Sequence, residues 1–94
     1  MHIISRKALK IAAGKHADVG VALDVWYRIS KGATWRSLDE VRQTWAHADS
    51  VRGRTVFNIK GNRYRLIVGI DYESQTIFIK DVLTHAEYNR GDWK

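Results

Sequence analysis

The stretch that decides the fold lies in the second half of the chain, where apolar and polar residues alternate. It reads Thr55-Val56-Phe57-Asn58-Ile59-Lys60-Gly61-Asn62-Arg63-Tyr64-Arg65-Leu66-Ile67-Val68-Gly69-Ile70-Asp71. A period of two is typical of β-strands, because successive side chains of a strand point to opposite faces. Gly61-Asn62 tolerates the positive φ of a tight hairpin. We therefore expect strands over 55–60 and 63–71, and a third over 76–82 after the polar turn 72–75, in an antiparallel meander.

Alternation assigns the side chains of these strands to two faces. The core face, turned toward helices, would hold Phe57, Ile59, Tyr64, Leu66, Val68, Ile70, Ile77 and Ile79. The opposite face would hold Asn58, Lys60, Arg63, Arg65, Phe78 and Lys80. The second set predicts an open basic surface with an aromatic ring on it, and its cluster of cations suits phosphates.

The first half of the chain shows helical spacing. Residues 1–5 favour an edge strand, and Ser5 is a candidate N-cap for a helix over 6–15 that turns Leu9, Ala12 and Ala13 inward. Asp18 is a second candidate N-cap, for a helix that ends at Lys31-Gly32. We expect this helix to turn inward Val21, Ala22, Val25, Trp26 and Ile29.

A third helix is predicted from Ser37 to about Ala46. Ser37 followed three residues later by Glu40 is a capping-box pattern. A narrow apolar stripe is formed by Leu38, Val41 and Trp45. Helices followed by strands indicate an α+β fold, with the helices packed on one face of a small antiparallel sheet and a short helical turn at the C-terminal end.

Length and composition limit the class of protein. With 94 residues, 45% of them apolar, the chain is expected to form one domain over 1–94. The absence of cysteine excludes disulfide and thiolate chemistry and fits a reducing compartment. No apolar run approaches the roughly 20 residues of a membrane span, and the opening lacks the apolar core of a signal peptide. We expect a cytoplasmic protein that does not engage membranes.

The charge favours polyanionic partners. The formal net charge is +6, from 16 Lys and Arg against 10 Asp and Glu. Between residues 50 and 70 there is no acid, but there are five basic residues: Arg52, Arg54, Lys60, Arg63 and Arg65. A solvated strand face would also carry Lys and Arg, to keep the sheet soluble. The lack of interspersed acids favours a phosphate-binding surface instead.

The segment after the third strand is a candidate acid–base site. It reads Thr84-His85-Ala86-Glu87-Tyr88, which places His85 and Tyr88 three residues apart and hence on one side of a helical turn. Both side chains can move protons. Alternatively, Thr84 merely caps a terminal helix and Tyr88 packs its ring against the sheet, and the spacing does not decide between the two interpretations.

Other residues carry weaker signals. His2, His16 and His47 show no metal-ligand spacing, so no metal site is expected, and no motif for a nucleotide cofactor is present. Trp26 and Trp45 fall on helical stripes, which favours the core. Trp35 in a loop and Trp93 near the end could instead stack on a base or a partner, although core or interface positions are commoner.

Two segments carry a resemblance to a known family. They are Val56-Phe57-Asn58-Ile59-Lys60-Gly61-Asn62-Arg63-Tyr64-Arg65-Leu66-Ile67-Val68 and Thr84-His85-Ala86-Glu87-Tyr88. Together they closely resemble the HigB toxins of bacterial type II toxin–antitoxin systems. The opening Met1-His2-Ile3-Ile4 and the run Ala8-Leu9-Lys10 are similar too, so the resemblance covers nearly the whole chain.

The resemblance implies a RelE-like fold with an open basic face for RNA. It further implies an mRNA interferase, an endoribonuclease acting on translated mRNA in the ribosomal A site. The implied partner is a HigA antitoxin with a helix-turn-helix DNA-binding domain. The implied mechanism uses no metal or other cofactor: the ribose 2′-OH attacks the adjacent phosphorus and the 5′-oxygen leaves.

The resemblance also implies roles for individual residues. Arg65, with Lys60 and Arg63, would stabilise the phosphate charge, because guanidinium groups bind phosphate oxygens bidentately. His85 would exchange protons with the 2′-OH or the leaving oxygen, and Tyr88 would assist or hold the nucleotide. Which of the two is base and which is acid stays open. Further RNA contacts are expected from Asn58, Asn62, Arg63, Lys80, Arg52 and Arg54.

Two other functions remain as alternatives. A non-catalytic protein that binds RNA or the ribosome would use the same face without proton transfer by His85 and Tyr88. A DNA-binding regulator would use helices 18–31 and 37–46 as a helix-turn-helix. Against the regulator, the second helix opens with Asp39 and Glu40, where phosphates would approach, and its stripe is needed for the core.

Overall fold

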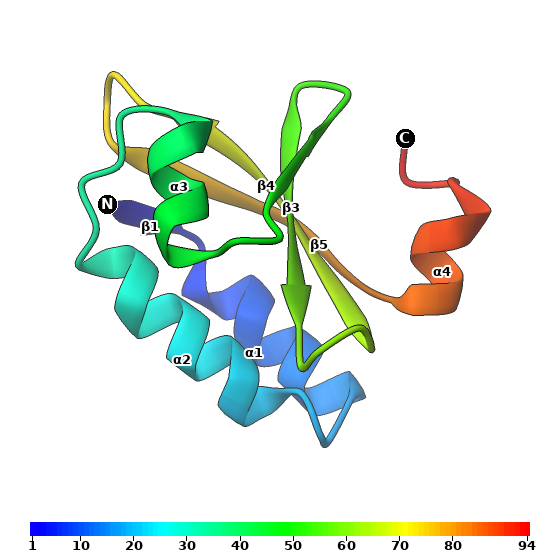
Figure 1. Ribbon diagram of the computed structural model, residues 1–94. Helices are drawn as coiled ribbons and strands as arrows, with labels where there is room; N and C mark the ends of the chain where they lie inside the picture. The colour runs from blue at the N-terminus through cyan, green and yellow to red at the C-terminus, as the bar shows by residue number, and fades with distance from the viewer.

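The computed structural model describes residues 1–94 and shows an α+β fold (Figure 1) built on one five-stranded sheet. The elements in chain order are β1 (His2–Ile4), α1 (Arg6–Lys15), α2 (Gly20–Lys31), α3 (Leu38–Thr44), β2 (Asp49–Val51), β3 (Arg54–Ile59), β4 (Tyr64–Asp71), β5 (Thr76–Thr84) and α4 (His85–Arg90). The predicted fold class is confirmed.

The sheet has the order β1-β5-β4-β3-β2. The predicted meander is present, since β3, β4 and β5 pair antiparallel. The expectation of a wholly antiparallel sheet was wrong, because β1 pairs parallel with β5 and places Ile3 opposite Ile77. The short strand β2 was not predicted; it pairs antiparallel with the start of β3 and is too short to show alternation.

The β3–β4 turn is wider than the two-residue turn that the sequence suggested. The strands end at Ile59 and resume at Tyr64, so the turn spans residues 60–63. Lys60 and Gly61 adopt positive φ angles of 53° and 64°. Lys60 and Arg63 therefore leave the strands, and alternation no longer fixes the direction of their side chains.

Helices α1, α2 and α3 cover the predicted core face of the sheet. The ring of Phe57 meets Trp26 of α2 and Trp45, just after α3, with centroid separations of 5.3 and 6.4 Å. The predicted core residues Phe57, Ile59, Tyr64, Leu66, Val68 and Ile77 are buried, and Ile70 and Ile79 pack partly buried against them. The outer face, opposite these helices, is left for the candidate site.

The predicted inward face of α2 was only partly right. Trp26 is fully buried, but Val21, Val25 and Ile29 are 81, 48 and 43% exposed. The buried stripe runs instead through Leu23, Trp26 and Ser30. Both stripes have helical spacing and share Trp26, so the period alone does not separate them; the packing of Trp26 on Phe57 fixes which side of the helix faces the sheet. An apolar stripe is thus left on the surface of α2.

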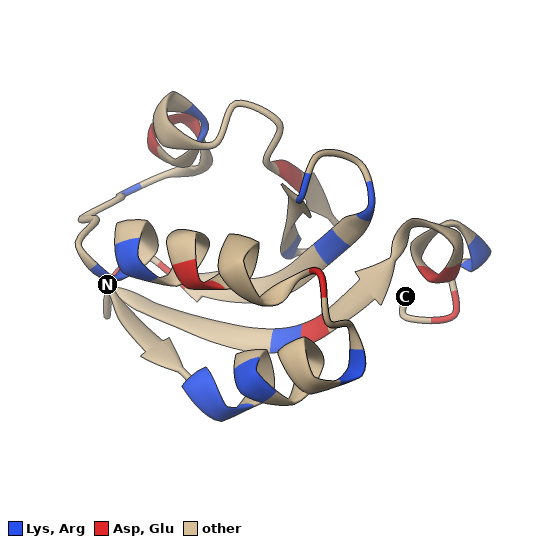
Figure 2. Cartoon of the chain, turned by 90° about the horizontal axis from the view of Figure 1, so that it is seen from below, with Lys and Arg blue, Asp and Glu red and all other residues tan.

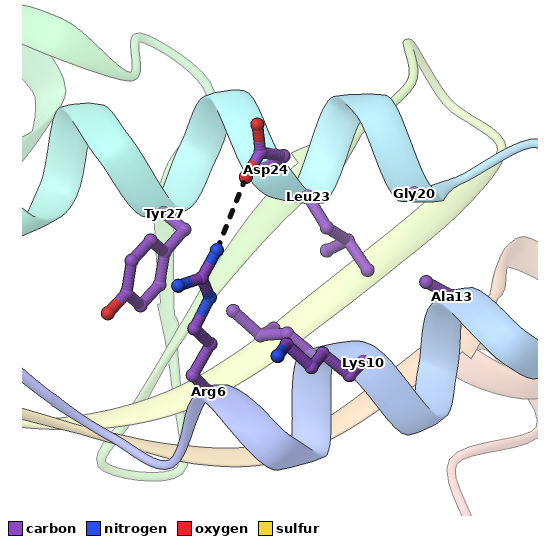
Figure 3. A pocket seen from close by; sticks show the side chains of 8 residues that line it. Arg6, Lys10, Ala13, Gly20, Leu23, Asp24 and Tyr27 are labelled. Atoms are coloured by element: carbon purple, nitrogen blue, oxygen red, sulfur yellow. Dashed lines mark ion pairs between the residues drawn. The ribbon is translucent and has the colours of Figure 1, made fainter.

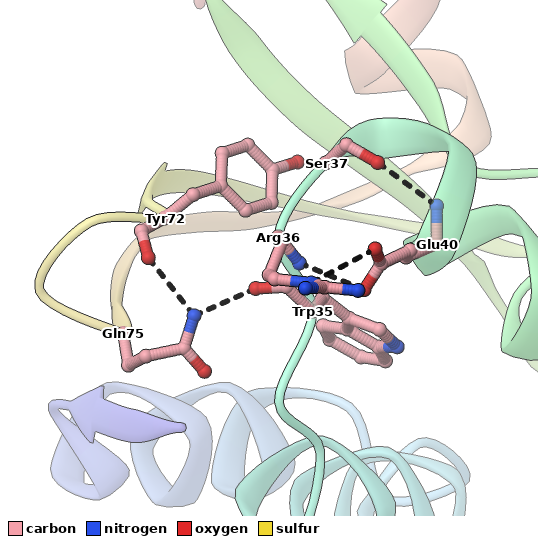
Figure 4. A network of polar contacts seen from close by, with 6 residues as sticks. All are labelled: Trp35, Arg36, Ser37, Glu40, Tyr72 and Gln75. Carbon is pink, nitrogen blue, oxygen red and sulfur yellow. Dashed lines mark hydrogen bonds and ion pairs between the residues drawn. The ribbon is translucent and has the colours of Figure 1, made fainter.

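The predicted caps have mixed outcomes. Ser5 precedes α1 but makes no side-chain cap bond, and α2 begins at Gly20, after Val19 rather than Asp18. Ser37 accepts a hydrogen bond from the amide of Glu40 over 3.3 Å, as predicted. The reciprocal half of that box is absent, because the carboxylate of Glu40 accepts from the backbone and side chain of Arg36 (Figure 4).

Polar contacts tie the α2–α3 connection to the β4–β5 turn. The amide of Gln75 donates to the carbonyl oxygens of Trp35, over 2.6 Å, and of Tyr72, over 2.9 Å (Figure 4). The side chain of Trp35 is buried in the core. The option that Trp35 stacks on a ligand is therefore wrong.

A shallow groove of about 190 Å³ separates α1 from α2 (Figure 3). Arg6 crosses it to an ion pair with Asp24 at 3.9 Å, and its guanidinium lies 4.8 Å from the ring centre of Tyr27. None of the helices is long and apolar enough to span a bilayer.

Candidate functional site

Helix α4 brings the acid–base segment to the end of the sheet, beside the β3–β4 turn (Figure 1). Thr84 forms a full capping box with Glu87, as each side chain bonds the backbone of the other. The hydrogen bond from the Thr84 amide lowers the pKa of Glu87. The amide of His85 donates to the carbonyl of Arg63 over 2.9 Å. Thr84 thus does cap a terminal helix, and that helix faces β4.

Arg65 lies at the centre of the candidate site. It occupies the outer face of β4, opposite Asn58 of β3, and is 8% exposed. Its Nη1 donates to the carbonyl oxygens of Asn62 and Tyr64, over 3.1 and 3.2 Å. Its Nη2 lies 3.4 Å from Oδ1 of Asn62 and 3.1 Å from Nδ1 of His85. A buried cation is tolerated here because its donors are hydrogen-bonded.

The contacts of His85 fix its tautomer. A guanidinium carries only donors, so Nδ1 of His85 must present a lone pair to Arg65, and a neutral imidazole then carries its hydrogen on Nε2. The structure places Nδ2 of the Asn89 side chain 3.0 Å from Nε2 of His85. Since that nitrogen is only a donor, the contact is a hydrogen bond with this tautomer when the Asn89 amide is turned by 180°, so that its oxygen accepts the Nε2 hydrogen. Sequence reasoning missed Asn89, although its spacing of four from His85 places it on the same side of α4.

Tyr88 lies against cations and rings rather than against the sheet core. The guanidinium of Arg65 is 5.5 Å from the centre of its ring. Trp93 stacks on the Tyr88 ring at 5.0 Å with an interplanar angle of 18°, and its indole nitrogen donates to the Tyr88 carbonyl. Arg65, His85 and Tyr88 are thus brought together, as the sequence analysis expected, and Trp93 stacks within the chain.

Lys60 and Arg63 are drawn away from Arg65 by a carboxylate. Asp18, in the α1–α2 connection, accepts from the Tyr64 hydroxyl over 2.5 Å and pairs with Lys60 and Arg63 at 3.3 and 3.4 Å. The Tyr64 hydrogen bond, aided by Lys60, lowers the pKa of Asp18 to about 2. The same bond raises the pKa of Tyr64. Lys60 and Arg63 thus lie together on Asp18 and take no part in the contacts of Arg65.

The other predicted RNA-binding residues fall into two groups. Asn58 and Asn62 border Arg65, and their side chains are 3.5 Å apart. Arg54 opens β3, four residues from Asn58 and so roughly 13 Å away. Arg52 lies in the β2–β3 turn with a φ of 52°, and Lys80 sits 5.7 Å from the ring centre of Phe78 on β5. Only the two asparagines adjoin the Arg65 cluster.

Positive charge is also found outside the strands. Helix α1 carries Arg6, Lys7, Lys10 and Lys15 and no acid, and Figure 2 shows basic residues along this helix as well as on the sheet. Basic residues are therefore not confined to residues 50–70. No group of three or more His, Cys, Asp or Glu side chains gathers in the structure.

Comparisons with known proteins agree on one family. A family model described as HigB_toxin, RelE-like toxic component of a toxin-antitoxin system, matches residues 20–91. A protein named mRNA interferase HigB from Escherichia coli O6:H1 (strain CFT073) is 30% identical over 93 residues, which cover 96% of this chain and 90% of that relative. The mRNA interferase toxin HigB of Escherichia coli K12 is 37% identical over 101 residues, covering 95% and 88%. The mRNA interferase HigB of Shigella flexneri has the same values.

Proposed function

Because this chain belongs to the HigB family of RelE-like toxins, we propose that it is an mRNA interferase, an endoribonuclease that cleaves translated mRNA and so stops growth. We assign the proposed ribonuclease activity to this site because Arg65 contacts both His85 and Tyr88. A phosphate-binding cation, a proton carrier and a phenol meet there, where helix α4 adjoins the outer face of β4.

In the proposed reaction the ribose 2′-oxygen attacks the adjacent phosphorus. The bond from phosphorus to the 5′-oxygen breaks, which leaves a 2′,3′-cyclic phosphate and a free 5′-hydroxyl. The 2′-OH loses one proton and the leaving oxygen gains one, so the proton count balances. The protein must therefore stabilise negative charge on the phosphoryl oxygens and relay one proton, and the reaction requires no metal.

Arg65 is proposed to bind the scissile phosphate. Its fork of donors can engage two phosphoryl oxygens at once, and its buried position strengthens the interaction because water competes less. The guanidinium of Arg65 contacts neutral carbonyl and amide oxygens and an imidazole, so a phosphate that binds it displaces no carboxylate. A bound phosphate would therefore be the only negatively charged group in contact with this guanidinium.

Binding of phosphate would also activate His85. In the free protein the Nδ1 lone pair is occupied by Arg65. When the guanidinium turns to the phosphate, Nδ1 is released and can accept the proton of the 2′-OH. Asn89 would keep the ring in place through Nε2 during this exchange. In this scheme an empty site holds His85 inactive, and the substrate itself frees the base.

Tyr88 is proposed to orient the nucleotide and to donate a hydrogen bond to the leaving oxygen. Its ring is fixed between Arg65 and Trp93, so its hydroxyl has a defined direction. Lys60 and Arg63 are proposed to attract the RNA backbone from their place beside Asp18 and to reach the reacting phosphate only if that ion pair opens. Arg52, Arg54 and Lys80 would contact more distant phosphates.

The proposal extends to partners. We propose that cleavage takes place in the cytoplasm on mRNA held in the ribosomal A site, where the positive field of a +6 protein assists docking to rRNA. A HigA-type antitoxin with a helix-turn-helix domain would neutralise the toxin. Helix α3 has seven residues and carries Asp39 and Glu40 in its first turn, which disfavours it as a DNA recognition helix.

The experiment is induced expression of the wild type, His85→Ala and Arg65→Ala in bacteria, with growth followed and new 5′ ends mapped on cellular mRNA. His2→Ala and Arg36→Ala serve as matched controls, since both residues are exposed and lie outside the cluster. We expect arrest and new ends within translated frames for the wild type and the controls only. Any cleavage of free RNA by the purified protein should be unchanged by a chelator, which cannot be added to the ribosomal reaction because ribosomes need Mg²⁺.

Other outcomes identify the alternatives. Arrest without new 5′ ends would mean that the protein blocks translation by binding alone. Normal cleavage by His85→Ala would remove this residue from the mechanism. Loss of RNA binding in Arg65→Ala, with His85→Ala and Tyr88→Ala still causing arrest, would likewise favour the non-catalytic binder.

A further inference from the structure

A polar hollow borders Arg65 and is not used by the mechanism above. It has a volume of about 510 Å³ and is lined by His47, Asn58, Gly61 and Asn62. A second hollow of about 250 Å³ shares His47 and Asn58 and adds a largely apolar wall from residues 44–48.

The polar groups of this hollow are mostly free. The amide nitrogen of Asn58 lies 3.5 Å from Oδ1 of Asn62, which leaves the Asn58 oxygen and the Asn62 nitrogen without a partner. The imidazole of His47 makes no hydrogen bond within the chain and is exposed. The hollow therefore presents a hydrogen-bond acceptor, a donor and a flat ring.

The hollow is joined directly to the proposed phosphate-binding residue. Oδ1 of Asn62 also lies 3.4 Å from Nη2 of Arg65. Gly61, at the tip of the turn, has a φ of 64°, and a Cβ added there would meet nothing within 4 Å. A ligand can thus approach the turn backbone closely while a phosphate attached to it sits on Arg65.

We propose that this hollow is a nucleobase subsite, which holds an unpaired base of the nucleotide next to the scissile phosphate. The inference rests on the proposed ribonuclease function and gives that site a means of sequence preference. Side-chain amides recognise base edges because each offers a donor beside an acceptor. His47 provides a stacking surface, as aromatic and histidine rings commonly do for single-stranded RNA.

The test measures base preference in binding and in cleavage separately. Short RNAs with one position varied are made in a cleavable form and in a 2′-O-methyl form, which cannot undergo attack by the 2′-oxygen. Binding of the second form is measured by fluorescence anisotropy for the wild type, His47→Ala and Asn58→Ala. His2→Ala and Gln43→Ala are the matched controls, since both positions are exposed and outside the hollow.

We expect the wild type to prefer particular bases at one position in both assays. Asn58→Ala should reduce that preference by about 5-fold to 150-fold, the usual value of a base-edge contact. His47→Ala should weaken binding of all four bases at that position, because stacking tolerates every base. The controls should behave as the wild type.

The test distinguishes failure of the proposed subsite from failure of the proposed ribonuclease function. If the wild type cleaves RNA but the variants keep every base preference and affinity within twofold, the subsite is wrong and the ribonuclease stands. If no RNA is cleaved even when it is presented on translating ribosomes, yet base-dependent binding is lost in Asn58→Ala, the ribonuclease is wrong and the subsite stands.

Discussion

Removing the cap of α4 should loosen the candidate site without weakening the core. The change is Thr84→Ala, which deletes the hydroxyl that accepts from the Glu87 amide over 3.2 Å. Loss of an N-cap costs about 0.5–2 kcal/mol, typically about 1. Helix α4 buries none of its residues, so little packing resists its opening.

The expected changes in Tm, amide exchange and cleavage follow from this free energy of capping. A cost of about 1 kcal/mol raises the open population of α4 about 5-fold. If the same energy were lost from the whole domain, a protein of this size would lose roughly 4–8 °C in Tm. We expect instead an unchanged Tm, faster amide exchange confined to residues 85–91, and RNA cleavage reduced by no more than about 5-fold.

The assays are amide hydrogen exchange by mass spectrometry or NMR, thermal unfolding, and single-turnover cleavage. Thr84→Ser should restore all three, because serine caps as well as threonine. Thr34→Ala, in the exposed connection after α2, is the matched control. A Tm lowered by several degrees would show that α4 unfolds with the core, and cleavage lost completely with normal exchange would show that the Thr84 hydroxyl touches the substrate; either result refutes the reasoning.

Three further results are expected. Arg65→Lys should slow single-turnover cleavage by roughly 10²–10³-fold, because an ammonium cannot reproduce the guanidinium fork, and a rate within tenfold of the wild type would contradict the assignment. The pKa of Asp18 is about 2 against 3.8 for a free carboxyl, so its stabilising contacts are complete above pH 4 and are lost as the pH falls through 2. A carboxyl NMR titration should show this, and an inflection near 4 would refute it. Phe57→Ala should lower the free energy of unfolding by about 3–5 kcal/mol in urea titration, since its ring contacts two tryptophans, and a loss below about 1 kcal/mol would show that the core repacks.

Local patterns were enough to predict most of the sheet. Alternation over 55–71 gave the strands and the core face correctly, because side-chain direction in a strand depends only on position. The parallel pairing of β1 with β5 could not be predicted, since a strand of three residues has no pattern of its own. On α2, Val21 and Val25 fit the helical period as well as the buried stripe does, and only the packing of Leu23 and Trp26 decides between them.

The site was predicted in part, because local spacing determines on which side of a helix or strand a side chain lies. Spacing within the helical turn placed His85 and Tyr88 on one side, and β4 supplied Arg65 from the outer face. Asp18 lies far from Lys60 and Arg63 in the sequence, so no local signal shows that they pair. Interactions of this kind depend on how the α1–α2 connection meets the β3–β4 turn, and a single sequence does not reveal it.

The parallel pairing of β1 with β5 bears on the order of folding. The first strand hydrogen-bonds to the last one, so it has no partner until almost the whole chain is available. Long-range pairing of this kind slows folding, because the loop must close before the contact stabilises it. We therefore expect β1 to dock late in refolding, after β3, β4 and β5 have formed their meander.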